Sequence, residues 1–292
     1  MASKSGITFN PDRFKKDQWR FHLFLVVLCL FMGSPIVFAL NHAFKPYTEL
    51  FAFPPKFFVR RPTIDNFVRL VTFSQESGIP ISRYIFNSVV STLAVVTASL
   101  VLSSLAAFAL SKLEFRGKHT LNKINQYSLM FVPIAVAIPR FLILINIGIY
   151  NTMWAHILPL LAMPVGLFLI KQFMDTNVPK ELLEAAKIDG AGNWRIWWSI
   201  ALPLVAPALV TVAILAFQMS WGYTEGSNLF IDKEALRTLP FYMSTVVSQQ
   251  GNIVVTAGIG AAASLIMFLP NLIIFIFMQN KVMASMATSG IK

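Results

Sequence analysis

The sequence predicts an all-α polytopic membrane protein with six transmembrane helices. Of its 292 residues, 56% are hydrophobic and only 13% are charged, whereas a soluble domain carries roughly 25% charged residues. The apolar residues gather in long runs that are nearly free of Asp, Glu, Lys and Arg. Several runs reach about 20 residues, and a helix of that length spans about 30 Å, the thickness of the hydrocarbon core.

Charge and cysteine content narrow the class further. The net charge is +11, and positive flanks of membrane spans explain it better than nucleic-acid binding, because Lys and Arg are retained on the cytoplasmic side. We therefore expect a lipid bilayer and no nucleic acid as partner. The single cysteine, Cys29, cannot form an internal disulfide and does not report a redox compartment. It is interpreted as a small buried hydrophobe.

The first 83 residues predict a tail, a span and a loop. Residues 1–20 are polar, and the uncharged run 21–40 is a first span. A signal peptide is the alternative, but the run exceeds the usual apolar core of a signal and no convincing cleavage site follows. Residues 41–83 contain five prolines, which forbid one continuous helix, so an extramembrane loop with short surface pieces is expected.

A second span is predicted over Tyr84–Leu110, which has no charged residue. Ser99, Ser103 and Ala107 recur at four-residue spacing. Small residues on one face let helices approach closely in lipid, so this span is expected inside a bundle. A polar link, 111–126, follows it.

The third predicted span, Tyr127–Ile149, is interrupted by Pro133, Pro139 and Arg140. Prolines inside a membrane helix free backbone groups that neighbours or water must satisfy, and such breaks often accompany a pathway. Arg140 has two interpretations. It is either a residue of that pathway or an arginine whose head reaches the outer interface.

Three further spans complete the pattern. The fourth, Trp154–Ile170, follows so closely that it forms a tight helical hairpin with the third. The fifth is Leu204–Trp221, followed by the polar loop 222–254. The sixth, Val255–Met278, is expected to be broken by Pro270.

Lysine and arginine counts orient the spans. With the N-terminus inside, the inner segments hold 15 of these residues and the outer segments hold 8, which favours cytoplasmic termini. Six of the outer ones lie in the first loop, a departure from the rule. The chain thus divides into a cytoplasmic tail (1–20), a first span (21–40), an external loop (41–83), a core with spans two to six (84–278) and a cytoplasmic tail (279–292).

One segment between the fourth and fifth spans, residues 179–203, is unusually polar. Pro179 suits a helix start, Lys180–Lys187 contains strong helix formers, and Gly190 suits a turn. A second helix over Asn193–Ala201 then returns to the membrane. The segment is either a docking knob for another protein or a solvated loop between helices. Three tryptophans argue against a flexible loop: Trp194, Trp197 and Trp198.

Sequence motifs for catalysis are absent. There is no phosphate-binding loop, since Gly117-Lys118-His119-Thr120 lacks both the upstream glycine and a Ser or Thr after the lysine. No HExxH, GxSxG or paired Cys/His spacing occurs, so no catalytic and no metal-binding residue is expected. If transport is active, another subunit must supply the energy.

In the polar segment, Glu184-Ala185-Ala186 is followed by Gly190, and after nine further residues by Ile200-x-Leu202-Pro203. This pattern resembles the EAA motif of importer permeases of the ATP-binding-cassette (ABC) type. Other stretches over about residues 64–292 resemble the carbohydrate branch, the maltose-type second permease subunit. These are Asn87-Ser88, Ala106–Leu110 with Phe115-Arg116-Gly117, Pro133 with Ile138-Pro139, Gly148–Thr152, Ile188–Ala191 and Arg237–Pro240.

The resemblance implies a type I ABC importer permease fold and a shared mechanism. Two related permeases form the channel, an extracytoplasmic solute-binding protein delivers a sugar or oligosaccharide, and two cytoplasmic ATPases use ATP and Mg²⁺. The chain itself would need no cofactor, and would lie in a bacterial or archaeal cytoplasmic membrane. The residues that carry over as ATPase-coupling elements are Glu184, Ala185, Ala186, Asp189, Gly190, Leu202 and Pro203.

One stretch departs from the family pattern. After the fifth span the family often reads SWNEF, whereas this chain reads Ser220-Trp221-Gly222-Tyr223-Thr224-Glu225-Gly226. The outer loop is thus expected to meet a different binding protein or a larger glycan. With Arg140, the candidates for the substrate path are Gln218, Trp221, Tyr223 and Glu225. Trp221 has a second interpretation as a membrane-interface anchor.

Three other functions remain open. The EAA motif alone also fits an importer permease for amino acids or phosphate. A channel or secondary transporter that works without an ATPase is a further alternative. A membrane enzyme is the third, and the chain offers no convergent acid, base or metal set for it.

Overall fold

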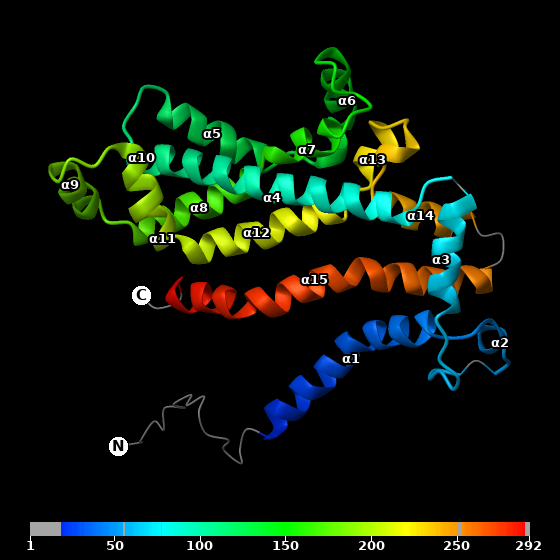
Figure 1. Cartoon of the computed structure of the whole chain (residues 1–292). Coiled ribbons are helices and arrows are strands. Elements are labelled where there is room, and N and C mark those ends of the chain that lie inside the picture. Colours follow the sequence, from blue (N-terminus) through cyan, green and yellow to red (C-terminus); the bar gives the residue numbers. More distant parts are fainter. Residues whose placement is uncertain (1–18, 55, 77, 250–252, 290–292) are drawn as a thin grey trace, which may run out of the picture.

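The computed structural model describes residues 19–54, 56–76, 78–249 and 253–289, and all regular elements in these ranges are helical. Four long helices run lengthwise through the molecule: α1 (Trp19–Ala43), α4 (Ile81–Lys112), α12 (Ala206–Trp221) and α15 (Ile253–Ser289) (Figure 1). α1, α4 and α15 each contain a stretch that is long and apolar enough to cross a membrane, and the stretch that starts with α12 reaches this length by running on to Leu229. The first, second, fifth and sixth expected spans therefore exist as helices.

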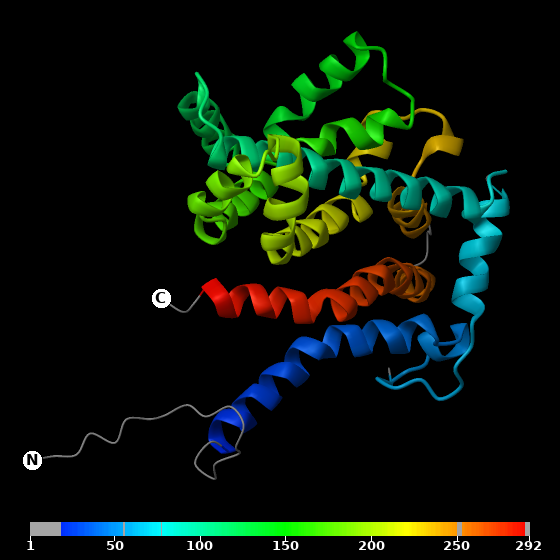
Figure 2. The same cartoon turned by 60° about the vertical axis from the view of Figure 1, so that its left-hand side comes forward.

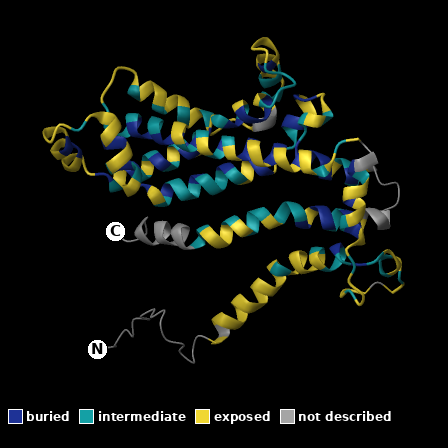
Figure 3. Ribbon diagram, viewed as in Figure 1, coloured by how far each residue is buried: buried dark blue, intermediate teal, exposed yellow. Residues whose placement is uncertain are grey.

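The chain before α4 forms a helix and a surface-lying connection. α1 continues through Pro35, and the candidate span within it is not buried by the rest of the chain (Figure 3). The connection holds two short helices, α2 (Tyr47–Leu50) and α3 (Asp65–Glu76). α3 runs across the ends of α4, α15 and α1 (Figures 1 and 2). Of the expected tail 1–20, residues 1–18 lie outside the described residues.

α4 is the helix around which the second half packs. It contacts α7 (Trp154–Leu161), α8 (Pro164–Asn177) and α12. The three small residues at four-residue spacing, Ser99, Ser103 and Ala107, are all buried. Their burial confirms the expectation of close helix packing on that face.

The third span was expected to be one helix, and this expectation is wrong. Instead of one helix over 127–149, the chain forms α5 (Lys118–Ser128), the 3₁₀ helix η2 (Pro133–Val136) and the ten-residue α6 (Ala137–Asn146). Proline lacks the N–H that continues a helix, and Pro133 opens η2. α6 leans away from the bundle (Figures 1 and 2) instead of packing lengthwise as one arm of a tight hairpin.

The fourth span is bent, and the sixth is not broken. α7 and α8 meet at an angle of 41° across Ala162-Met163, directly before Pro164 at the start of α8. Pro270 lies within α15, which continues as one helix to Ser289, so the expected break is absent. By length and composition the described residues supply four spans, or five if α7 and α8 form one.

Two main cores hold the bundle together. One lies where α4, α8 and α12 meet the segment after α8, and it includes Phe108, Ile170 and Trp197. The other joins α15 to the opposite end, including Tyr84 and Tyr242. That end also carries α13 (Glu225–Leu229), η4 (Glu234–Leu236) and α14 (Leu239–Gln249).

Candidate functional site

The candidate coupling segment, residues 179–204, projects beyond the adjoining ends of α8 and α12 (Figure 1). Its first helix, α9 (Lys180–Ile188), begins after Pro179, whose backbone is extended. α10 (Asn193–Ile196) follows and continues through the π-helix η3 (Trp197–Ala201) into α11 (Leu202–Leu204). Two helical pieces joined by a short turn thus return the chain to the bundle.

The turn after α9 is a Schellman motif. The N–H of Ala191 donates to the carbonyl of Ala186 at 2.9 Å, and the N–H of Gly190 donates to the carbonyl of Lys187 at 3.0 Å. Gly190 has φ of +80°, a left-handed conformation that a Cβ atom disfavours. No other atom lies within 4 Å of where its Cβ would stand. Glycine is therefore required here by the backbone and not by crowding.

One face of the segment belongs to the protein core. Leu183 and Ala186 of α9 are buried, as are Ile196, Trp197 and Ala201. The ring of Trp197 lies 4.9 Å from that of Trp194 and 5.6 Å from that of Trp198. This packing holds the segment in place against the bundle. The alternative interpretation, a solvated loop between helices, does not account for it.

The opposite face of α9 is exposed. Glu184, Ala185, Asp189 and Gly190 are exposed, while Ala186 faces the core. Of the remaining two predicted residues, Leu202 is half-buried and Pro203 is exposed on α11. Ile188, which was not among the predicted residues, has 87% of its surface exposed. Its position at the end of an amphipathic helix, just before the turn glycine, was the signal available in the sequence.

Polar contacts fasten the start of the segment to α4. Asp175 in the last turn of α8 accepts from Lys171 at 2.8 Å and from the Ser111 hydroxyl at 2.5 Å. Lys112 Nζ donates to the carbonyl of Val178 at 2.6 Å. The end of α8, directly before the coupling segment, is thereby fixed to the end of α4.

A second cluster forms at the opposite end of the bundle. Arg140 of α6 lies 3.5 Å from a carboxylate oxygen of Glu225, and also 3.5 Å from the Tyr223 hydroxyl. Gly226 packs between Tyr223 and His156, where an added Cβ would lie 2.6 and 2.9 Å from their atoms. Three of the five predicted path residues are thus brought together, with Arg140 on α6, Glu225 on α13 and Tyr223 in the turn before α13.

The other two path candidates lie elsewhere. Gln218 is exposed on α12. Trp221 is buried, its ring stacks on Phe217 at 5.6 Å, and its Nε1 donates to the carbonyl of Met267 on α15 at 3.1 Å. Trp221 therefore packs α12 against α15, and its ring has no open face for a solute in this structure.

Two motifs that are remote in sequence meet near the N-terminal end of α4. Asn87 Nδ2 donates to the carbonyls of Ala235 and Arg237, both at 2.9 Å. The N–H of Leu239 donates to the Ser88 hydroxyl at 2.7 Å. The Asn-Ser pair therefore holds the segment that precedes α14.

A third motif holds the preceding loop. Asn151, in a left-handed conformation with φ of 58°, accepts from the N–H groups of Asp232 and Lys233 at 3.1 and 3.0 Å. The Tyr150 hydroxyl donates to the Asp232 carboxylate, and this hydrogen bond raises the pKa of Tyr150. The stretch 148–152 thus serves as a clamp on the polar loop 222–254.

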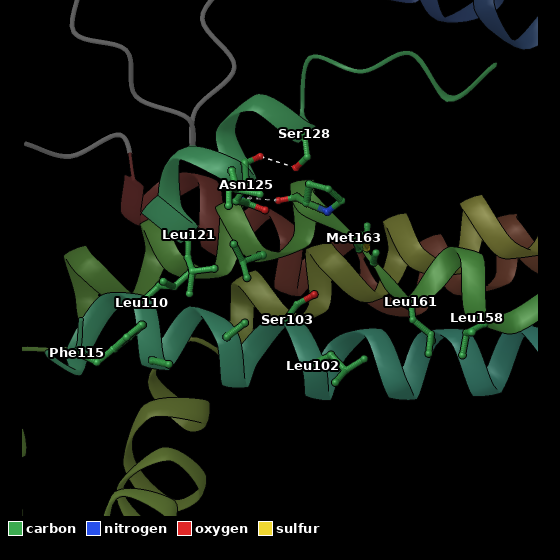
Figure 4. A pocket seen from close by; sticks show the side chains of 16 residues that line it. Leu102, Ser103, Leu110, Phe115, Leu121, Asn125, Ser128, Leu158, Leu161 and Met163 are labelled. Atoms are coloured by element: carbon green, nitrogen blue, oxygen red, sulfur yellow. Dashed lines mark hydrogen bonds between the residues drawn. The ribbon is translucent and has the colours of Figure 1, made fainter. Parts of the chain in front are cut away.

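An apolar cavity of about 720 Å³ lies between α4, α5, α7 and α8 (Figure 4). Ser128 and Asn125, two of its few polar lining residues, donate to the carbonyls of Asn125 and Pro164 (2.7 and 3.4 Å). Its walls are otherwise mostly aliphatic, including Leu102, Leu121 and Leu161. Such a surface does not suit the hydroxyl groups of a sugar. Within the described residues, no group of three His, Cys, Asp or Glu could hold a metal ion.

Comparisons with known proteins identify the family. The family described as the binding-protein-dependent transport system inner membrane component matches residues 26–281. The arabinooligosaccharides transport system permease protein AraQ of Halalkalibacterium halodurans is 30% identical over 264 residues, covering 88% of this chain and 90% of that protein. The galactooligosaccharides transport system permease protein GanQ of Bacillus subtilis is 26% identical over 280 residues, covering 93% and 94%.

A solved structure shares the fold. It is a chain of a bacterial ABC transporter involved in the import of the acidic polysaccharide alginate, with a TM-score of 0.76 and 19% sequence identity. The match covers 92% of this chain and 98% of that one.

The chain belongs to the family of binding-protein-dependent transport system inner membrane components. The resemblance to importer permeases that the EAA segment indicates is confirmed. It is a multi-pass membrane protein and a transport permease subunit, a class that is itself non-catalytic.

Proposed function

We propose that this chain is one of two permease subunits in an ABC importer for a sugar or oligosaccharide. Its relatives include permeases named for arabinooligosaccharide and galactooligosaccharide transport. One structural observation supports the coupling role. The inner face of α9 is buried in the protein core, while its opposite face is exposed. Since the chain contains no phosphate-binding loop, ATP and Mg²⁺ act in separate ATPase subunits.

The coupling segment is the proposed ATPase contact. Glu184 offers a charge for an ion pair or hydrogen bond, Ala185 lets a partner surface approach closely, and Ile188 offers an apolar side chain for a pocket. Exposed apolar anchors surrounded by polar groups are typical of interface centres. The Schellman turn and the core contacts would transmit a displacement of this surface to α4, α8 and α12.

We further propose that Arg140, Tyr223 and Glu225 line the solute path on the external side. Aromatic rings stack on the C–H faces of sugars, and a half-buried ion pair supplies directional hydrogen-bond groups. Gln218 remains a candidate because it is exposed on α12. Trp221 is assigned to packing, because its indole is engaged with α15.

The proposed orientation places both termini and the coupling segment in the cytoplasm of a bacterium or archaeon. α1 begins and α15 ends on the side where α9 lies (Figure 1). The charge distribution supports this side as the inner one. An extracytoplasmic binding protein would then deliver the solute to the end that carries α13 and α14.

Uptake by the reconstituted importer tests the proposal. The chain is co-expressed with its second permease and ATPase, placed in vesicles with ATP inside, and supplied with binding protein and labelled solutes outside. We expect ATP-dependent accumulation of an oligosaccharide and none of an amino acid. Amino-acid uptake alone would exclude the sugar assignment, and uptake by this chain without an ATPase would exclude the permease mechanism.

A further inference from the structure

The first external loop carries six Lys and Arg residues, against the usual bias for membrane proteins. The structure accounts for three of them. Lys45 is buried and donates to the carbonyl of Lys56 at 2.5 Å. Arg69 lies over the ring of Tyr47 at 5.2 Å, and Arg83 donates to the carbonyl of Ala235 at 3.1 Å.

The other three, Lys56, Arg60 and Arg61, have exposed side chains. Among the described residues, no ion pair involves them. The nearby carboxylate, Glu49, accepts the backbone N–H groups of Arg60 and Arg61, each at 3.0 Å. Their positions are thus fixed through the main chain, while the guanidinium groups are left for another partner.

Exposed phenylalanines accompany these cations. Phe53 and Phe58 have 94% and 67% of their surfaces exposed, and Phe57 is also exposed. Large apolar side chains gathered on a surface indicate an interaction site. Phenylalanine alternating with Lys and Arg is typical of segments that lie at a membrane interface.

Contacts with α1 fix the depth of this loop. The Phe57 ring centroid lies 6.2 Å from that of Phe38, which is part of the apolar span of α1. The N–H of Val59 donates to Asn41 Oδ1 at 3.2 Å, again at the end of α1. In both views the loop lies on the flank of the bundle beside the end of α1 and not over its centre (Figures 1 and 2).

We propose that residues 51–54 and 56–61 form an interfacial membrane anchor. Phe53, Phe57 and Phe58 enter the boundary between headgroups and acyl chains, and Lys56, Arg60 and Arg61 bind the phosphates of anionic phospholipids. Long basic side chains reach the headgroups while their stems stay apolar. Lipid is favoured over a protein partner because the loop continues the surface of α1, a span with little burial in the chain.

The orientation proposed above would place this loop in the outer leaflet, and only that placement depends on it. Immersion of the loop depends on the membrane class alone. Immersion of the loop and orientation of the chain are measured in separate experiments, because the orientation is tested by maleimide labelling of cysteine variants.

Spin labelling measures the immersion. Cys29 is the only cysteine, so a Cys29→Ser background allows single nitroxides at Phe53→Cys and, as control, at Asn228→Cys, an exposed position of α13. In phosphatidylglycerol vesicles the label at 53 should collide more with oxygen than with a water-soluble nickel complex, and the label at 228 should do the reverse. Equal nickel access at both sites overturns the proposal, as does shielding of 53 only when binding protein is added.

A charge variant tests the headgroup contacts. Replacing Lys56, Arg60 and Arg61 together with alanine removes the side chains but keeps the N–H groups bonded to Glu49. The preference for spin-labelled phosphatidylglycerol over phosphatidylcholine should fall at least about fivefold. A control with Lys56→Arg, Arg60→Lys and Arg61→Lys should keep it. An unchanged preference in the alanine variant contradicts the phosphate contacts.

Discussion

At the scale of single residues, Gly190 shows how a backbone conformation fixes a functional surface. Its φ of +80° closes the cap of α9 and orients the exposed Ile188 and Asp189. Gly192, two residues later, has an ordinary φ of −71° and open surroundings. The two glycines thus form a natural pair for comparison.

We expect Gly190→Ala to weaken ATPase association while the chain still inserts. An L-residue at this φ costs about 1 kcal/mol, which favours reorganisation of the cap. Gly190→Asn should retain more association, because Asn tolerates the left-handed region better. Co-purification of the ATPase provides the measurement, and Gly192→Ala is the control. Equal association of the Gly190→Ala and Gly192→Ala variants would contradict a requirement for this turn.

Asn87 on α4 fixes a connecting segment at the opposite end of the bundle from Gly190. Asn87→Ala removes a donor from the carbonyl of Arg237, and the carbonyl of Ala235 keeps Arg83. This hydrogen bond is partly buried, so the carbonyl left without a donor costs about 1 kcal/mol, and the thermal midpoint in detergent should drop by about 3 °C. Thr97→Ala on the same helix, which loses only an exposed bond within α4, should change the midpoint far less. Equal shifts would argue against the clamp.

The Glu49 carboxylate leads us to expect a pH dependence of the loop 41–83. The hydrogen bond from the N–H group of Arg60 holds the pKa of the Glu49 carboxyl below the ordinary 4.5, and the hydrogen bond from the N–H group of Arg61 lowers this pKa further. A lowered folded-state pKa means that the contribution to loop order is present above pH 4.5 and is lost as the pH falls through the lowered value. The nitroxide at position 53 should therefore gain mobility in detergent only below pH 4.5. A Glu49→Gln variant should lack this transition, and a transition that persists in it would assign the effect to another group.

At the scale of elements, α9 divides its two faces between folding and binding. Leu183 and Ala186 pack into the core shared with α8 and η3, while Ile188 faces outward. The alternation follows the helical period, so the sequence indicates an amphipathic helix. Which neighbours bury the inner face, however, follows from how α4 and α8 meet it.

Serine substitutions separate the two faces of α9. Ile188→Ser should lower ATPase affinity about tenfold, the effect of losing about 1.4 kcal/mol at an interface, with little change in the thermal midpoint. Leu183→Ser should instead lower the midpoint, because it removes a buried side chain and adds a hydroxyl. Ile124→Ser on α5, another exposed isoleucine, is the control. Unchanged affinity with Ile188→Ser would remove this residue from the contact.

The third span shows where element prediction fails. The apolar run 127–149 has the length of a span, but η2 and a short α6 replace one helix. A prediction from length and hydropathy counts the burial that a continuous helix would gain. It leaves out the two hydrogen bonds that such a helix would lose, because Pro133 and Pro139 have no N–H group. At Pro270 the same chemistry is tolerated within α15, where a longer helix supplies bonds on both sides of the proline.

At the scale of the whole molecule, the coupling segment and the cluster of Arg140, Tyr223 and Glu225 occupy opposite ends of one bundle, joined by α4 and α12 (Figure 1). In the proposed orientation, Lys187→Cys in the Cys29→Ser background should react with a membrane-impermeant maleimide only after cells are permeabilised. Asn228→Cys should react in intact cells. Both positions are exposed, so access to the reagent decides the result. The reverse pattern would invert the orientation.

The sequence by itself determined the helical membrane class, four of the spans and the EAA segment, because apolar run length and motif spacing are local properties of the chain. Only the tertiary structure decided that Arg140 meets Glu225, that Asn87 and Ser88 hold the segment before α14, and that Trp221 is a packing residue. Those contacts join residues 46 to 151 positions apart. Their partners depend on how the helices cross, which no local pattern encodes.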